Sequence, residues 1–166
     1  MKNTKYKAGF TVAELLIALA ISAMLLVAVA VAFNASAVNY RQNEDIFKVV
    51  NSARQALCRM TSQLRTASAV DPDAPNNECT MLTAANENIT YRYNSGDNTL
   101  YLITNDDLSD SDYVLCDNVT AMTCTKRWVI EDAMKIVQSV QISITVASSN
   151  VEKTISAAAA IRRNLN

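Results

Sequence analysis

Histidine is absent from this 166-residue sequence, and glycine and proline occur only twice each. Without an imidazole side chain the protein can build neither a Ser-His-Asp triad nor a Cys-His dyad, and histidine-dependent metal sites are excluded as well. Any catalysis would have to use carboxylates, and no Asp or Glu pair is marked out by its spacing. The sequence therefore favours a protein that is not an enzyme and needs no cofactor.

Strong net charge is also missing, because 15 basic and 16 acidic residues leave a net charge of -1. The charges are unevenly placed: Lys2, Lys5 and Lys7 precede a long apolar run, whereas 12 basic and 15 acidic residues follow Phe33. This mildly acidic later part argues against a nucleic-acid partner held by bulk positive charge. The length allows one membrane-embedded segment and one modest globular domain.

Cysteine occurs four times, but never with the C-x-x-C spacing of zinc or thioredoxin-like sites. An even number of cysteines favours two disulfides in an oxidising compartment, and the sequence does not separate the three possible pairings. The four positions are Cys58, Cys79, Cys116 and Cys124.

The longest apolar run extends from Leu15 to Phe33 and is interrupted only by Ser22. As a helix with a rise of about 1.5 Å per residue, this run is about long enough to cross a hydrocarbon core of about 30 Å. The lysines before it favour an N-terminus in the cytoplasm and a remainder on the other side of the membrane. An ordinary secretory signal with small residues at positions 35–37 and a plain single-span anchor are the alternatives.

Neither alternative explains Glu14, which stands directly before the apolar run. A carboxylate at the centre of a bilayer costs about 2.5 to 3.5 kcal/mol, and less near the interface. Cleavage between Gly9 and Phe10 would create an ammonium group one helical turn from this carboxylate, on the same chain or on a neighbouring subunit. Such a pair would neutralise both charges and fix the stagger of adjacent helices. The simpler interpretation is that Glu14 complements the positive end of its own helix.

The sequence KAGFTVAELLIALAI at positions 7–21 resembles the N-terminal signal of type IV pilins and type II secretion pseudopilins. The resemblance implies that a prepilin peptidase cleaves after Gly9 and N-methylates Phe10, and that Glu14 is needed for docking into a filament. It implies a minor pilin or pseudopilin, first in the bacterial inner membrane with a periplasmic head and then in a periplasmic or surface filament of like subunits. The family's one capping pseudopilin characteristically lacks the glutamate that Glu14 provides.

Two features depart from the family pattern. Ala13 is smaller than the branched residue that often precedes the glutamate. Many relatives have a helix-breaking Gly or Pro in the membrane segment, but this chain has neither between Gly9 and Pro72. Melting of the helix during assembly is therefore less assured.

The chain then divides into a leader at 1–9, a membrane and assembly helix at 10–33, an amphipathic upper helix at 34–70 and a head at 71–166. The upper helix is predicted from apolar residues at steps of three and four, and the prolines at 72 and 75 stop it near position 69. That apolar stripe comprises Ile46, Val50, Ala53, Leu57, Met60 and Leu64. Cys58 flanks the stripe, so we expect it to link the helix to the head through one of the other cysteines, with a buried free thiol as the alternative.

Alternating patterns after Cys79 predict strands at 89–93, 99–103, 119–125, 140–146 and 151–161. The first two flank a hairpin turn in which Gly96 is expected to take positive φ. In the last segment the alanines at 157–160 also have helical propensity, but every second residue would share one strand face. The fold class is therefore α+β, a long helix packed on an antiparallel sheet, as the resemblance also implies.

Two further groups of residues could form binding sites. Four aspartates in one loop could hold calcium, but their spacing is not that of an EF-hand and a solvated acidic loop is favoured; they are Asp106, Asp107, Asp110 and Asp112. Lys126, Arg127 and Trp128 could contact nucleic acid in a subunit for DNA uptake or adhesion, although a short exposed turn is favoured.

Overall fold

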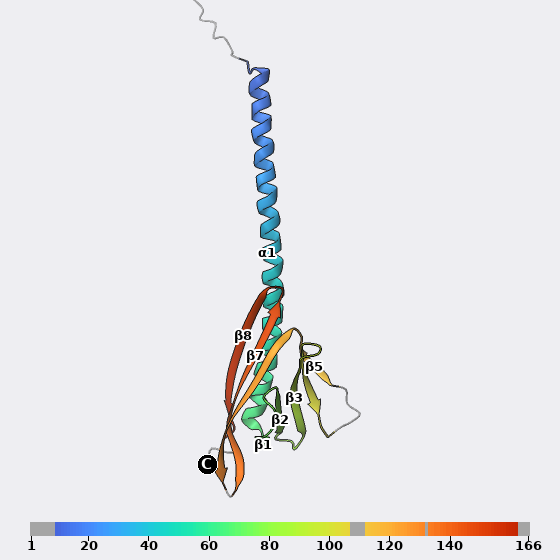
Figure 1. Ribbon diagram of the computed structural model, residues 1–166, viewed down its shortest axis with the longest axis vertical. Coiled ribbons are helices and arrows are strands. Elements are labelled where there is room, and N and C mark those ends of the chain that lie inside the picture. The colour runs from blue at the N-terminus through green and yellow to red at the C-terminus, as the bar shows by residue number, and fades with distance from the viewer. Residues whose placement is uncertain (1–8, 107–111, 132, 163–166) are drawn as a thin grey trace, which may run out of the picture. The chain divides into compact units, whose positions relative to one another are not determined.

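A computed structural model describes residues 9–106, 112–131 and 133–162. The chain forms two units, residues 1–41 and residues 42–166. Helix α1 (Val12–Thr66) contributes to both units, and the strands lie in the second (Figure 1). The strands are β1 (Ala69–Val70), β2 (Glu78–Leu82), β3 (Asn88–Asn94), β4 (Thr99–Thr104), β5 (Tyr113–Cys116), β6 (Val119–Glu131), β7 (Met134–Ser148) and β8 (Val151–Ala160).

Helix α1 is uninterrupted because no glycine or proline occurs between Gly9 and Pro72. It ends at Thr66, three residues before the predicted end. The reason is a competing strand: the Ser68 N–H donates to the Leu82 carbonyl at 2.8 Å, and Ala69 pairs with Leu82. The backbone after the helix therefore finds its hydrogen-bond partners in a sheet before the chain reaches the prolines.

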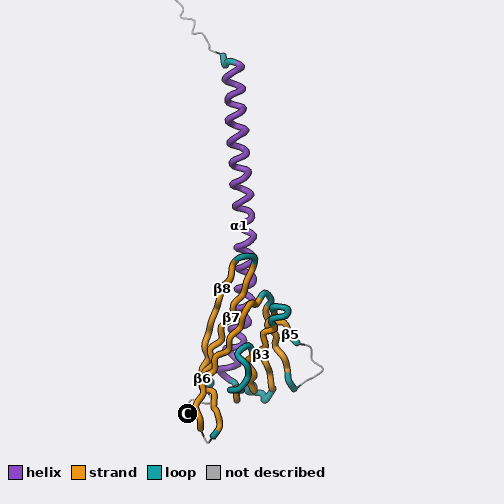
Figure 2. The backbone as a smooth tube through the Cα atoms, viewed as in Figure 1, coloured by secondary structure: helices purple, strands orange, loops and turns teal. Residues whose placement is uncertain are grey.

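The strands form two antiparallel sheets rather than the single sheet that was expected (Figure 2). The five-stranded sheet has the order β1-β2-β3-β4-β5, and the three-stranded sheet has the order β6-β7-β8. Each strand pairs with its neighbour in sequence, so the connections within each sheet are hairpins or short loops. The predicted α+β class, a long N-terminal helix on antiparallel strands, is confirmed.

All five predicted strands are present, at β3, β4, β6, β7 and β8. The alternation that predicted β7 is confirmed, because Val140, Ile142, Ile144 and Val146 are fully buried. In β8, Ala159 is buried and Ile155 and Ala157 are half-buried, whereas the residues between them are exposed. Strand formation therefore wins over the helical propensity of the alanines, since β8 can pair along its whole length with β7.

The turn between β3 and β4 differs from the prediction at one residue. Gly96 does not have positive φ, whereas Asn98 does, at 56°. Asparagine tolerates this region because its short polar side chain can bond locally. The side chain of Asp97 stabilises the turn by accepting hydrogen bonds from the Thr99 N–H at 3.1 Å and the Tyr101 hydroxyl at 2.7 Å.

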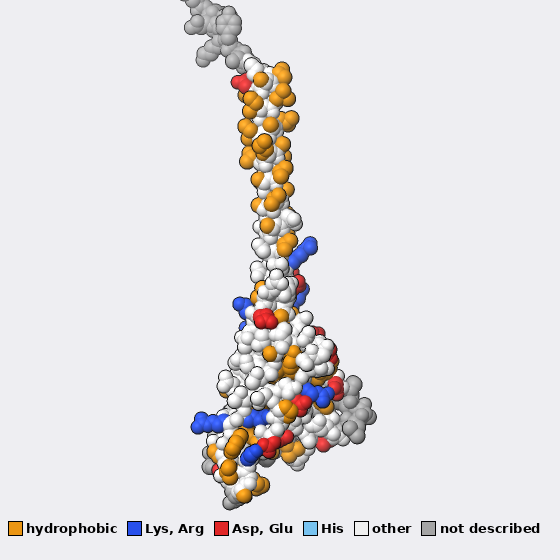
Figure 3. All heavy atoms as spheres, in the orientation of Figure 1, with side chains coloured by type: hydrophobic (Ala, Val, Ile, Leu, Met, Phe, Trp, Pro, Cys, Tyr) orange, Lys and Arg blue, Asp and Glu red, His pale blue; other side chains and the backbone are white. Residues whose placement is uncertain are grey.

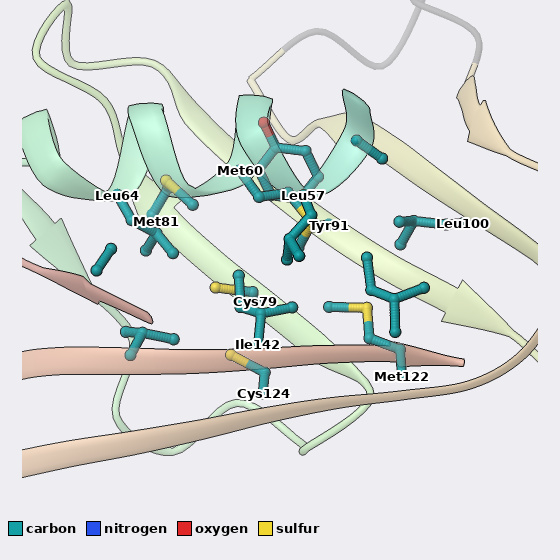
Figure 4. Packing of buried hydrophobic residues seen from close by; sticks show 14 of the residues in the cluster. Leu57, Met60, Leu64, Cys79, Met81, Tyr91, Leu100, Met122, Cys124 and Ile142 are labelled. Carbon is teal, nitrogen blue, oxygen red and sulfur yellow. The ribbon is translucent and has the colours of Figure 1, made fainter. Parts of the chain in front are cut away.

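The core of the second unit lies between the later part of α1 and the two sheets (Figure 4). The predicted stripe supplies the helical side of this core: Ala53, Leu57, Met60 and Leu64 are buried, while Val50 and Ile46 are half-buried. Met81 and Tyr91 come from the five-stranded sheet and Ile142 from the three-stranded one. Since one helical face covers both sheets, loss of a large side chain from it should cost several kcal/mol.

Tyr91 on β3 connects the sheet to the helix by a polar contact inside this core. Its ring is fully buried, and its hydroxyl donates to Oε1 of Gln63 on α1. Burial raises the pKa of Tyr91 to about 12, and the positive charge of Arg59 opposes the rise. The neutral hydroxyl is thus the form that the folded head stabilises.

Stability should consequently fall at high pH. The folded pKa of Tyr91 lies above its ordinary value of 10.0. Its contribution is therefore complete below about pH 10 and is lost as the pH rises towards about 12. Two pKa units correspond to about 2 to 3 kcal/mol. Urea unfolding of the full chain in detergent at pH 9 and pH 12 measures the loss.

Tyr91→Phe should lower the free energy of unfolding at pH 9, because the hydrogen bond to Gln63 is removed. Between pH 10 and 12, the free energy of unfolding of this variant should depend less on pH than that of the unsubstituted protein. Tyr113→Phe alters an exposed ring and is the matched control. If the free energy of unfolding of Tyr91→Phe falls with pH as steeply as that of the unsubstituted protein, the buried hydroxyl does not cause the loss of stability at high pH.

Candidate processing and assembly site

The described residues of the first unit present an exposed apolar helical surface. Large hydrophobic side chains from Leu15 to Phe33 are exposed, with exposed fractions of 64% for Leu15 and 75% for Phe33. Figure 3 shows hydrophobic side chains gathered over this first part of α1. Among the described residues, α1 is the one helix long and apolar enough to cross a membrane. Leaving so much apolar surface in water is unfavourable, so lipid or other helices must cover it.

The N-terminus of α1 is closed by Thr11 and Glu14. The Thr11 N–H donates to Oε2 of Glu14 at 2.9 Å, and the Glu14 N–H donates to Oγ1 of Thr11 at 3.3 Å. The Thr11 hydroxyl adds a bond to the same Oε2 at 3.0 Å. This is a capping box, in which each side chain satisfies the other residue's free backbone N–H. The interpretation of Glu14 as a helix cap thus has a defined geometry.

Glu14 has acceptor capacity beyond this cap. Both bonds from Thr11 end on Oε2, and Oε1 has no hydrogen-bond partner among the residues the structure describes. A carboxylate can accept on both oxygens. An ammonium group could therefore bind Glu14 without first breaking the cap.

Gly9 and Phe10 lie just outside the helix and are open to a partner. Phe10 is 89% exposed, and a Cβ built on Gly9 would meet nothing within 4 Å. The bond between them is therefore accessible and outside regular structure. Lys2, Lys5 and Lys7 lie outside the described residues.

Thr11 is the residue at this site that the sequence interpretation missed. The signal was available, since Thr11-Val12-Ala13-Glu14 matches the capping-box pattern directly before an apolar run. Glu14 was interpreted mainly through the resemblance to pilins, and its pairing with Thr11 was not considered.

A family model described as the prokaryotic N-terminal methylation motif matches residues 4–30. The match includes Gly9, Phe10, Thr11 and Glu14 and most of the exposed apolar helix. No curated protein and no solved structure matches the chain. The motif and the long apolar helix together support a type IV pilin-like protein, and they fit a protein anchored in a membrane. The motif implies processing by a prepilin peptidase and assembly with other pilin subunits.

The four-aspartate loop does not form a recognisable metal site in the described residues. Asp107 and Asp110 lie outside them. Asp106 Oδ2 accepts the Asn88 N–H at 2.7 Å, and Asp112 Oδ2 lies 3.4 Å from Arg92 Nη2. The described part of the chain contains no group of three Cys, Asp or Glu side chains that could hold a metal ion. The two visible aspartates therefore have structural partners.

The favoured interpretation of Lys126, Arg127 and Trp128 as a short turn is wrong. All three lie within β6, where a bulge separates Arg127 from Trp128. Lys126 Nζ donates to the Ala74 carbonyl at 2.5 Å, and Lys135 Nζ lies 5.4 Å from the centre of the Trp128 ring. A strand forms because β7 continues beside β6 to Met134 and pairs with it to the tip.

The cysteines separate into one exposed and three buried residues. Cys58 is exposed on α1, whereas Cys79, Cys116 and Cys124 are buried, and all four are thiols in the structure. The structure brings the thiols of Cys79 and Cys124 close together, and each perturbs the pKa of the other. It shows no comparable contact for Cys58 among the described residues, so the predicted link from Cys58 stays a prediction.

Proposed function

We propose that the protein is a minor pilin or pseudopilin of a type IV pilus or type II secretion pseudopilus. It enters the inner membrane with its N-terminus in the cytoplasm and its head in the periplasm. A prepilin peptidase cleaves after Gly9 and methylates Phe10, and the mature subunit joins the filament through α1. The observation that carries the proposal is the methylation motif at residues 4–30 on an exposed apolar helix.

Cleavage is a hydrolysis of the Gly9–Phe10 peptide bond, and the peptidase supplies the catalytic groups. Water adds across the bond, leaving a carboxylate on Gly9 and an ammonium group on Phe10. This chain contributes access: Gly9 has no side chain, and the space around it is open. Methylation of the new amine preserves its positive charge.

The role proposed for Glu14 is to receive that charge. In the membrane the Phe10 ammonium and the Glu14 carboxylate are each costly alone and less costly as a pair. The cap formed by Thr11 holds the carboxylate at the start of the helix and leaves Oε1 for the ammonium of a neighbouring subunit. Because only one axial stagger brings the two groups together, the pair selects the register of adjacent helices.

The remaining helix surface supplies the contact area. Small alanines are interspersed with the large aliphatic residues, at positions 18, 20, 23, 28, 30 and 32. Small residues allow helices in lipid to approach closely, which increases van der Waals contact. Subunits can therefore exchange helix–lipid contact for helix–helix contact during assembly.

A subunit for DNA uptake or adhesion is the second interpretation, and the described contacts do not favour it. Two of the cations near Trp128, Lys126 and Lys135, are engaged within the head by the Ala74 carbonyl and by Asp73. A groove for a nucleic-acid backbone needs cations that are free to meet phosphates.

Photocrosslinking in the native host tests the proposal. A photoreactive amino acid at Leu19, which is 65% exposed, should capture other chains that begin with an N-methylated residue. The same probe at Ile130 in the head is the control, because that side chain is also exposed but belongs to the second unit. Adducts at Leu19 with lipid alone, in cells that assemble filaments, would contradict the assembly role.

A further inference from the structure

Two buried cysteines face each other where the two sheets of the head meet. Cys79 lies on β2 of the five-stranded sheet and Cys124 on β6 of the three-stranded sheet, and neither is accessible to solvent. Figure 4 shows the two side chains next to one another in the core, and each thiol perturbs the pKa of the other. Within the described residues no backbone ladder joins these two sheets.

The backbone around the pair is held in register by contacts between the two sheets. The Cys124 N–H donates to the Asn76 carbonyl at 2.7 Å, and Lys126 Nζ donates to the Ala74 carbonyl at 2.5 Å. Lys135 on β7 also binds Asp73. The segment that leads into β2 is thus fixed to β6 and β7 on one side of Cys79, which keeps the two sulfur atoms close.

We propose that Cys79 and Cys124 form a disulfide that links the five-stranded sheet covalently to the three-stranded sheet. The proposal rests on the proposed export of the head to an oxidising compartment. Disulfide geometry requires cysteine Cα atoms about 4.4 to 6.8 Å apart with Cβ atoms directed at each other, which strands of two facing sheets can meet.

The bond forms by thiol–disulfide exchange with an oxidising protein. The thiolate of one of the two cysteines attacks a disulfide of that protein and releases one of its thiols; the other cysteine, losing its proton, then attacks the mixed disulfide at the sulfur of the first cysteine and releases the second thiol. Two thiols are oxidised and one external disulfide is reduced. The reaction must precede closure of the core, since both sulfur atoms are then buried.

The other two cysteines do not offer an equivalent pairing. Cys116 on β5 lies near Ser52 on α1 and donates a hydrogen bond to the Asp117 carbonyl at 3.3 Å. Ser52 and Cys58 are separated by about 9 Å along the helix. The Cys116 thiol near Ser52 is therefore too far from Cys58 for a disulfide. The proposed pairing therefore leaves Cys58 and Cys116 as thiols, and it differs from the predicted link between the helix and the head through Cys58.

Peptide mapping of the full chain from native membranes tests the pairing. Free thiols are alkylated at once, and the unreduced protein is digested with trypsin and with a protease that cleaves before aspartate. The second protease is needed because trypsin has no cleavage site between Cys116 and Cys124, whereas a cut before Asp117 separates them. We expect one linked peptide joining Cys79 to Cys124, with Cys58 and Cys116 alkylated. A link through Cys58, or four alkylated cysteines, would overturn the proposal.

Two further measurements separate failure of the disulfide proposal from failure of the proposed function. Protease added to spheroplasts reports whether the head is periplasmic, and oxidation of the purified chain by oxidised glutathione reports whether the geometry allows the bond. A periplasmic head with four thiols would reject the disulfide alone. A cytoplasmic head would reject both the location and the native disulfide.

Thermal unfolding in detergent provides an independent measurement. Reductant, or the double substitution Cys79→Ser and Cys124→Ser, should lower the Tm by about 10 °C, since the bond closes a long loop. Cys58→Ser is the matched control and should leave both the Tm and its response to reductant unchanged. The reductant arm keeps the test valid if the double variant does not fold, and a Tm insensitive to reductant would contradict the proposal.

Discussion

Glu14→Ala should abolish incorporation of the subunit into filaments while cleavage after Gly9 continues. The change removes the acceptor for the Phe10 ammonium of a neighbouring subunit and leaves that charge unpaired among apolar helices. Loss of one partner of a buried charge pair costs about 2 to 5 kcal/mol, which corresponds to a loss of incorporation of about 30-fold or more. Immunoblots of filament and membrane fractions measure the distribution, and the mature mass measures cleavage.

Glu14→Gln separates the charge from the helix cap. The amide oxygen of glutamine can still accept the Thr11 N–H that now bonds to Oε2 of Glu14, so the capping box is preserved. We expect Glu14→Gln to fail in assembly nearly as completely as Glu14→Ala. Normal incorporation of Glu14→Gln would show that Glu14 acts as a cap and that no ion pair is needed.

Gly9→Val should block processing and leave the full precursor in the membrane. The reason lies in the peptidase, because this chain has open space at Gly9 and would tolerate a larger residue there without strain. A β-branched side chain instead occupies the space through which the peptidase must approach the bond. We expect cleavage to fall at least about 100-fold, on the order of 3 kcal/mol in barrier height. The ratio of precursor to mature mass in membranes is the readout.

Val12→Ala is the matched control for this experiment. Val12 is exposed, lies in the first helical turn and takes no part in the hydrogen bonds of the capping box. It should be processed normally. Efficient cleavage of Gly9→Val would contradict the proposed cleavage position, whereas poor cleavage of both variants would point to a general fault in insertion.

The helix and its buried face could be predicted because they depend on local rules. The apolar stripe has helical spacing and no residue within it interrupts the helix, so burial of Met60 and Leu64 followed from sequence. The end at Thr66 could not be predicted in the same way. It depends on pairing of Ala69 with Leu82, a contact between residues that are distant in sequence.

Three strands were missed, for two different reasons. β1 has two residues and β5 has four, which is too short for a period to appear in sequence. β2 (Glu78–Leu82) does alternate in burial, and this signal was overlooked. The division into two sheets could not be predicted either. It depends on β5 and β6 not pairing with each other, and the sequence pattern of a strand does not specify its partner. Likewise Gly96 is the more permissive residue, yet the side chains of Asp97 and its neighbours place the positive φ at Asn98.

The residues of the candidate site came from the sequence, whereas its geometry did not. Glu14 was singled out by its place before the apolar run, and the resemblance to pilins implied the roles of Gly9 and Phe10. All three lie within the matched motif, and their roles stay predictions. The cap by Thr11 and the unused Oε1 of Glu14 required atomic positions. The contact between Cys79 and Cys124 joins residues that are far apart in sequence, so spacing could not distinguish it from the other pairings.

The central claim is that this chain is processed as a pilin-like subunit, and the N-terminal residue of the mature protein tests it most directly. Mass spectrometry of membranes from the native host should find a chain that begins at N-methylated Phe10. A mature chain that begins near Val38 would indicate ordinary secretion, and an intact N-terminus would indicate a simple anchor. Either of these two results would contradict the account.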